Sequence, residues 1–178
     1  MTDKLIIAGF GGQGIITAGE VLAWIAMSFD MKVTHYPSYG AEMRGGTANC
    51  TVVISDEEIF SPVVSHPDSV LVMNEPSLKK FMPVVVKDGS LIYDSTLVKV
   101  QNERKDIKIV SFPVTQEADR LGNSKVANMI LLGLFLKIKK LFDPEKVVNA
   151  IEKFFTSKNK KNLIPLNIKA FEIGYKSF

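Results

Sequence analysis

The sequence is poor in the residues that most often carry redox and metal chemistry. Its 178 residues include one cysteine, Cys50, and two histidines, His35 and His66. One cysteine cannot form an internal disulfide, and an iron–sulfur cluster usually needs about four thiolates. Neither histidine has a partner at a spacing typical of metal ligands. We therefore expect no cluster and no metal ion held by this chain alone, and the single thiol favours a reducing cytoplasm.

Long apolar runs and a strong excess of one charge are also missing. The longest apolar stretch, Val126 to Leu136, is interrupted by Asn128, whereas a membrane-spanning helix needs about 20 apolar residues. Met1–Lys4 leads directly into the apolar Leu5–Ala8, without the pattern of a signal peptide. The formal net charge of +3 is too small to predict nucleic-acid binding, which needs a concentrated basic face. We expect neither membrane nor nucleic acid as a partner.

The hydrophobic pattern predicts one α/β domain over residues 1–178, a length that can bury a sizeable core. Short apolar or β-branched runs predict strands at Leu5–Ala8, Lys32–Tyr36 (ended by Pro37), Thr47–Ser55, Ser69–Met73, Ser90–Asp94 and Lys108–Phe112. Three- and four-residue periodicity and capping signals predict helices over 15–29, 76–82, 115–121, 126–141, 147–155 and 165–175. The order favours a Rossmann-like three-layer domain with a mainly parallel sheet and a helical C-terminal third. Its first strand, helix and second strand predict a parallel βαβ unit.

The strongest local motif is the glycine loop Gly9–Gly14, which reads Gly-Phe-Gly-Gly-Gln-Gly. It matches the G-x-G-x-x-G pattern between a strand and a helix, where a helix N-terminus can bind phosphate. A dinucleotide site also needs an acidic residue at the end of the second strand. Here that strand ends His35–Pro37, Asp30 precedes it, and Glu42 lies beyond it. Three interpretations stay open: a dinucleotide site, a turn that only allows close packing, and a contact with a cofactor shared with another subunit.

A second polar, glycine-rich loop follows at Tyr39–Gly46. It places Glu42 and Arg44 between glycines beyond the carboxyl end of a strand, the edge where open α/β sheets bind ligands. The two side chains could pair with each other, or Arg44 could meet a phosphate or a partner's carboxylate. The candidate coenzyme or subunit contacts in the two loops are Gly11, Gly12, Gln13, Gly14, Tyr39, Gly40, Glu42, Arg44 and Gly45.

Together, the two loops resemble the gamma subunit of the 2-oxoacid:ferredoxin oxidoreductases. The resemblance rests on Ile7–Gly14 and Tyr39–Gly46 and extends over Leu121–Met129 and Asn167–Tyr175, so it covers nearly the whole chain. The Gly-Ala-Glu-Met-Arg-Gly-Gly form of the second loop is most similar to the 2-oxoglutarate type. A pair of such motifs is far more specific than a lone glycine fingerprint.

The resemblance implies an accessory subunit of an oxidoreductase complex, of the EC 1.2.7 type, that converts a 2-oxoacid and CoA to acyl-CoA, CO₂ and reduced ferredoxin. Thiamine diphosphate, Mg²⁺ and iron–sulfur clusters are then expected on other subunits: alpha, beta and a possible delta subunit. The isolated chain is expected to be inactive and to contribute no catalytic residue. In the family the gamma domain lies near the route of CoA, which assigns that contact to Gly11–Gln13 and the 39–46 loop. The rival interpretations are a free-standing nucleotide-binding Rossmann-like domain, either a small dehydrogenase or a regulator, and a purely structural module.

Overall fold

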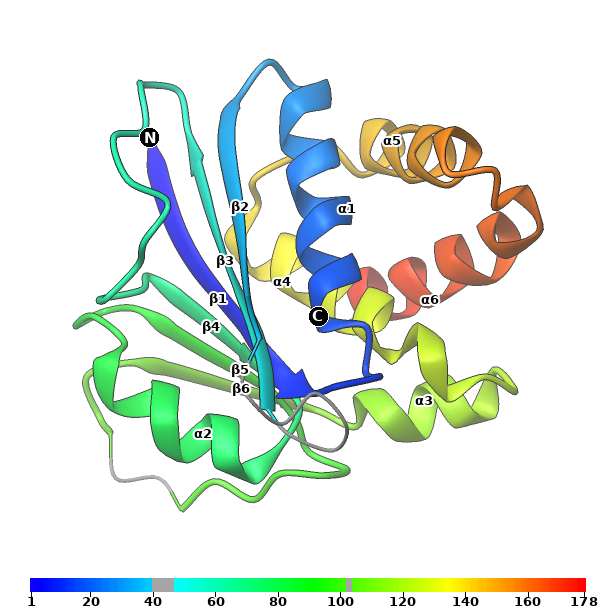
Figure 1. The fold of residues 1–178 in the computed structure, drawn as a ribbon. Helices are drawn as coiled ribbons and strands as arrows, with labels where there is room; N and C mark the ends of the chain where they lie inside the picture. The colour runs from blue at the N-terminus through cyan, green and yellow to red at the C-terminus, as the bar shows by residue number, and fades with distance from the viewer. Residues whose placement is uncertain (40–46, 102–103) are drawn as a thin grey trace.

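A six-stranded sheet forms the centre of the protein, which we describe from a computed structural model (Figure 1). The structure describes residues 1–39, 47–101 and 104–178. The strand order is β2-β3-β1-β4-β5-β6. The strands are β1 (Thr2–Phe10), β2 (Lys32–Tyr39), β3 (Thr47–Ser55), β4 (Ser69–Val72), β5 (Ser90–Asp94) and β6 (Lys108–Phe112).

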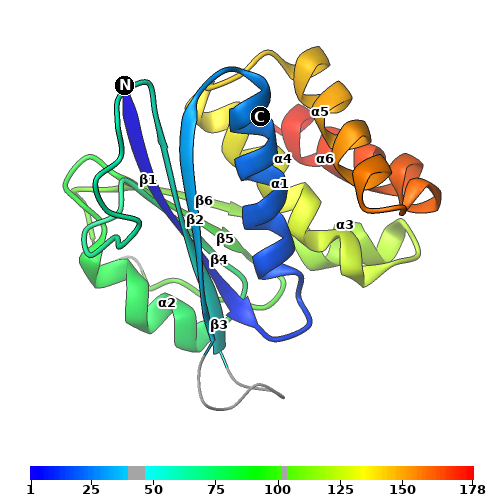
Figure 2. The same ribbon diagram turned by 45° about the horizontal axis from the view of Figure 1, so that its top comes forward.

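Helices cover the sheet unequally, and Figure 2 shows α2 alone on one side and the other α-helices on the opposite side. The helices are α1 (Ile15–Ser28), α2 (Glu75–Phe81), α3 (Val114–Arg120), α4 (Ala127–Lys139), α5 (Pro144–Ser157) and α6 (Ile164–Lys176), with short 3₁₀ turns at η1 (Met82–Val84), η2 (Ser124–Val126) and η3 (Lys161–Leu163). The larger core cluster lies between the sheet and the α1, α4 side, and a smaller one lies under α2. The predicted α/β class with a mainly parallel sheet is confirmed.

The sheet has one antiparallel strand in an unexpected place. β1, β4, β5 and β6 pair in parallel, but β3 lies between β1 and β2 and is antiparallel to both. β1 and β2 therefore run in the same direction, as the βαβ prediction requires, without being neighbours. The prediction that Pro37 ends the second strand is wrong, because β2 continues to Tyr39 and Pro37 pairs opposite Cys50. β2 is an edge strand, where a proline need not donate a ladder hydrogen bond.

Helix α4 is the most enclosed helix of the described chain. All ten residues from Ala127 to Leu136 are buried, as expected for a helix that is apolar on every side. α6 lies so close to it that a Cβ atom at Gly133 would come within 2.1 Å of the Phe171 carbonyl oxygen, and one at Gly174 within 1.9 Å of that of Ile130. Only glycine fits at these two positions. Within the described ranges, no helix is both long and apolar enough to cross a membrane.

Candidate functional site

The glycine loop joins the carboxyl end of β1 to the N-terminus of α1, and the side chain of Gln13 holds it in place. Gln13 Oε1 accepts a hydrogen bond from the Phe10 backbone N–H at 2.6 Å, and Nε2 donates to the Met73 carbonyl at 3.2 Å. Met73 directly follows β4, the strand next to β1 in the sheet. The loop is thus tied to the carboxyl edge of the parallel strands, where ligands bind in open α/β sheets.

Two glycines of this loop are required for packing. A Cβ atom at Gly9 would lie 2.5 Å from Gln13 Oε1, and one at Gly14 would lie 2.5 Å from Asn128 Nδ2. Gly14 also has a φ of 73° and precedes α1, in the left-handed region that favours glycine. Its carbonyl accepts hydrogen bonds from the Ala18 N–H and from Asn128 Nδ2, both at 2.9 Å. The packing interpretation therefore explains Gly9 and Gly14.

Gly12 is different, because packing does not explain it. It is exposed, its φ is 96°, and no heavy atom would lie within 4 Å of an added Cβ. The backbone of Gly12 can thus be approached closely from outside. No side chain caps the N-terminus of α1, so the N–H groups of its first turn are free to bind an anion. The loop has the features of an anion-binding turn at Gly12–Gly14.

The position of β3 argues against a dinucleotide site. In a dinucleotide-binding fold the strand after the first helix is the parallel neighbour of the first strand and ends in the acid that binds ribose. Here that place is taken by β3, which runs the opposite way and begins at Thr47 directly opposite Phe10. β2, the strand that follows α1, ends one strand further away. The sheet therefore lacks both the parallel neighbour of β1 and the acidic residue at its end that a dinucleotide site needs.

Part of the predicted site lies outside the described residues. This applies to Gly40, Glu42, Arg44 and Gly45, so both interpretations of the Glu42 and Arg44 pair stay predictions. The flanking residues Tyr39 and Thr47 are at the ends of β2 and β3, and Thr47 pairs with Phe10 beside the glycine loop. Both ends of the segment are therefore at the same edge of the sheet as Gly11–Gly14.

Two buried asparagines at this edge were not predicted as site residues. Asn128 is 4% exposed; its Nδ2 binds Gly14, while Oδ1 has no hydrogen-bond partner within the described chain. Asn74 is 2% exposed; its Oδ1 accepts from the Ser77 N–H at 2.8 Å, and its Nδ2 is likewise without a partner there. The sequence signal for Asn128 was its interruption of an apolar run, since a buried amide needs hydrogen-bond partners.

Cys50 and His35 lie against Gly19 on the other side of α1 from solvent. A Cβ atom at Gly19 would come within 2.6 Å of Cys50 Sγ and 2.7 Å of His35 Nε2. The thiol is buried and donates to the Ile15 carbonyl at 3.6 Å, and burial raises the pKa of Cys50 to about 12. Burial also lowers the pKa of His35. Cys50 therefore lacks the properties of a nucleophile, because a reactive thiol needs a lowered pKa.

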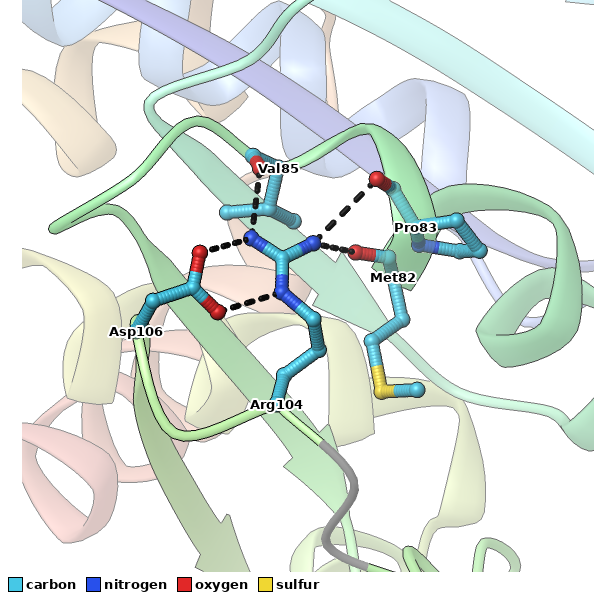
Figure 3. A network of polar contacts seen from close by, with 5 residues as sticks. All are labelled: Met82, Pro83, Val85, Arg104 and Asp106. Atoms are coloured by element: carbon cyan, nitrogen blue, oxygen red, sulfur yellow. Dashed lines mark hydrogen bonds and ion pairs between the residues drawn. The ribbon is translucent and has the colours of Figure 1, made fainter.

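The most extensive polar network lies elsewhere and is structural (Figure 3). Arg104 forms a bidentate pair with Asp106, at 2.6 and 2.7 Å, and donates to the carbonyls of Met82, Pro83 and Val85 at 3.1 to 3.2 Å. The paired guanidinium lowers the pKa of the Asp106 carboxyl. All five guanidinium N–H groups are occupied, so Arg104 is not available to a ligand. It fixes the end of η1 to the segment before β6.

The fold and the loop together define a class of protein: an α/β domain with an exposed glycine turn at a helix N-terminus, but with an antiparallel strand where a dinucleotide-binding fold has its ribose-binding strand. The chain belongs to the pyruvate ferredoxin/flavodoxin oxidoreductase family, whose sequence profile matches residues 4–177. It is 37% identical over 172 residues to the ketoisovalerate oxidoreductase subunit VorA of Methanothermobacter thermautotrophicus. The matched segment covers 96% of this chain but only 35% of VorA. The chain thus spans about a third of the length of that relative.

Two further relatives are closer to this chain in length. The 2-oxoglutarate synthase subunit KorC of Archaeoglobus fulgidus is 37% identical over 170 residues, covering 95% of this chain and 84% of KorC. The crystal structure of the keto/oxoacid ferredoxin oxidoreductase gamma subunit from Geobacter sulfurreducens PCA superposes with a TM-score of 0.83 at 27% identity, covering 99% of this chain and 95% of that one. The fold of this chain is that of the gamma subunit, as the resemblance implied.

Proposed function

We propose that this chain is the gamma subunit of a 2-oxoacid:ferredoxin oxidoreductase complex of the 2-oxoglutarate type, which forms acyl-CoA, CO₂ and reduced ferredoxin. The observation that carries the proposal is the full-length similarity to KorC, in which nearly all of this chain aligns with most of that subunit. The Gly-Ala-Glu-Met-Arg-Gly-Gly motif at 40–46 supports the same type. VorA, named for ketoisovalerate, makes a branched 2-oxoacid the main alternative substrate.

The residues of this chain do not fit the redox cofactors of such a complex. The only cysteine is buried, and its pKa is raised to about 12, whereas a cluster needs about four thiolates. In the described ranges, no three His, Cys, Asp or Glu side chains form a group that could hold a metal ion. We assign thiamine diphosphate, Mg²⁺ and the clusters to alpha, beta and possible delta subunits, which also deliver electrons to ferredoxin. A free thiol at Cys50 is consistent with a cytoplasmic complex.

Purification of the complex through a tag on this chain tests the assignment. We expect larger partner subunits, a brown iron–sulfur absorbance, and oxidation of 2-oxoglutarate that depends on thiamine diphosphate and CoA. A panel of pyruvate, 2-oxoglutarate and 2-ketoisovalerate then identifies the substrate by kcat/KM. If the chain purifies alone, or if the chain alone is active, the proposal fails. Calorimetry of the chain with NAD(H), NADP(H) and FAD is expected to give no saturable heat, against the free-standing nucleotide-binding alternative.

We also propose that the turn at Gly11–Gly14 contacts coenzyme A, with the N–H groups of Gly12 and Gly14 at a phosphate, since the Gln13 N–H already donates to the Phe10 carbonyl. The support is the exposed backbone at Gly12 and the uncapped N-terminus of α1. Arg44 and its neighbours in the 39–46 loop, whose ends flank the same edge, are assigned to the same contact. The chain binds and orients the coenzyme, while bond making and breaking occur on other subunits.

A pair of isosteric substitutions separates charge from backbone strain at this turn. Gly12→Asn and Gly12→Asp place side chains of equal size at the same left-handed position, and only the second adds a negative charge. We expect Gly12→Asp to raise the KM for CoA several-fold more than Gly12→Asn, with the KM for the 2-oxoacid unchanged in both. Arg44→Ala is expected to raise the KM for CoA as well. Equal CoA kinetics in the two Gly12 variants would make the turn a packing device.

A further inference from the structure

One part of the sheet surface carries no helix. α2 packs on β1 and β4, whereas β2 and β3 are covered by α1 from the other side. Within the described residues, no helix packs on β2 and β3 on the α2 side. Instead the connection between β3 and β4, over 56–68, lies on this side of the sheet (Figure 1).

This connection is anchored on both sides of an exposed phenylalanine. Ile59 and Val64 pack into the core cluster under α2, and the Pro62 carbonyl accepts a hydrogen bond from Thr51 Oγ1 of β3 at 2.8 Å. Between these anchors, Phe60 is 93% exposed. Its exposure is therefore imposed by an ordered segment, and nothing in the described chain covers the ring.

Two more apolar side chains extend the exposed area. Val63 is 64% exposed, and Tyr36 of the edge strand β2 is 50% exposed. Tyr36 is directly opposite Thr51 in the ladder, and directly paired residues of an antiparallel sheet point to the same face. The ring of Tyr36 therefore lies on the face where Thr51 holds Pro62. We call Tyr36, Phe60 and Val63, with the neighbouring Glu57 and Glu58, the Phe60 surface.

The Phe60 surface has the composition of a protein-binding site. Grouped exposed aromatic and apolar side chains mark interaction sites on proteins, and aromatic residues dominate the binding energy of interfaces. Glu57 and Glu58 are exposed, and neither has an ion-pair partner within the described residues. A complementary surface would offer an apolar recess for the ring and cationic groups for the two carboxylates.

We infer that the Phe60 surface docks another subunit of the proposed complex, through an apolar recess rimmed by lysine or arginine side chains. The inference rests on the proposed function. The lengths of the relatives favour a different polypeptide over a second copy of this chain. In VorA the matching region is about a third of a longer protein, so the domain there has a covalently linked neighbour. KorC, of which the match covers 84%, has little length beyond this domain, so a subunit of the KorC kind must recruit such a neighbour by docking.

Binding measurements with partner subunits co-expressed without this chain test the inference. Each variant of this chain is titrated against them at low and high salt, after a thermal melt that confirms folding. We expect Phe60→Ser to weaken binding at least tenfold. We expect Glu57→Gln combined with Glu58→Gln to weaken binding mainly at low salt, because screening already removes this attraction at high salt.

Matched controls remove an exposed apolar group or a carboxylate elsewhere. Met27→Ser on α1, where the side chain is 52% exposed, and Glu152→Gln on α5 are expected to bind within twofold of the unaltered chain. Unchanged binding of Phe60→Ser overturns the inference while leaving the proposed function intact. So does self-association of the isolated chain that Phe60→Ser abolishes, since a second copy is then the occupant. If the unaltered chain binds no other subunit, the proposed function fails together with the inference.

Discussion

The contact between Gly14 and Asn128 can be tested by a double-mutant cycle. Gly14→Ala should cost about 1 to 2 kcal/mol for a left-handed alanine. Its Cβ would also lie 2.5 Å from Asn128 Nδ2, and such overpacking costs about 1 to 3 kcal/mol. Asn128→Ala should cost about 1 kcal/mol for the lost hydrogen bond to the Gly14 carbonyl, partly offset because an unpaired buried oxygen is removed as well.

In the double variant the clash is absent, because the Asn128 amide that the new methyl group would strike has been removed. We therefore expect the double variant to be about 1 to 3 kcal/mol more stable than the two single losses of stability predict together. Urea unfolding followed by the fluorescence of the single tryptophan, Trp24, measures each free energy of unfolding. Trp24 suits this purpose because its ring packs against Phe154 at a centroid distance of 5.9 Å.

The matched control for this cycle is Gly12→Ala combined with Asn128→Ala. Gly12 has a positive φ but no atom within 4 Å of an added Cβ, so its substitution adds strain without a clash. This control pair is expected to be additive within about 0.5 kcal/mol. If the Gly14 pair is equally additive, Gly14 and Asn128 are not in close contact.

Three other measurements follow from the packing around α1 and α4. Gly174→Ala should lower the free energy of unfolding by about 2 kcal/mol in urea titrations. The new Cβ would lie 1.9 Å from the Ile130 carbonyl oxygen, and the cost of this overpacking exceeds the gain in helix propensity. Unchanged stability would contradict the close approach of α6 to α4. Burial lowers the pKa of His35, so the contribution of neutral His35 to the free energy of unfolding is complete above about pH 6.5 and is lost as the pH falls. His35→Gln should therefore flatten the fall in melting temperature below pH 6.5. An equally steep fall in the variant would show that His35 is not its cause. Cys50, with a pKa of about 12, should resist iodoacetamide at pH 8 until urea is added, and alkylation of the folded protein at the unfolded rate would show that the thiol is accessible.

Local sequence patterns predicted the elements of this fold well, because each depends on near neighbours. The alternating residues of Thr47–Ser55 and the short runs Ser90–Asp94 and Lys108–Phe112 become strands with the predicted bounds. Asp143, which stands directly before Pro144 in the sequence, caps α5, and its side chain accepts from the Lys146 N–H at 3.0 Å. Such signals are short-range and can be found without knowing the rest of the chain.

Features that depend on distant residues were not predictable in this way. The place of β3 between β1 and β2 depends on which strands pair in the sheet. The prediction that Pro37 ends the second strand was wrong because a proline is tolerated within a strand that lies at the edge of the sheet, as β2 does. The role of Asn128 depends on Gly14, 114 residues earlier. In the candidate site, the glycine turn was predicted from its motif. The hydrogen bonds that hold it, from Gln13 to the Met73 carbonyl and from Asn128 to the Gly14 carbonyl, could be found only in the tertiary structure.

The close approach of α6 to α4 has a consequence for the order in which the protein is made. The ribosome completes α4 before α6, and until α6 arrives the face of α4 around Ile130 and Gly133 has no cover. Hydrophobic surface exposed at that stage is prone to aggregation. A segment with a side chain at the place of Gly174 could not pack this closely on α4, so the nascent domain must wait for α6, and chaperone binding is most needed in that interval.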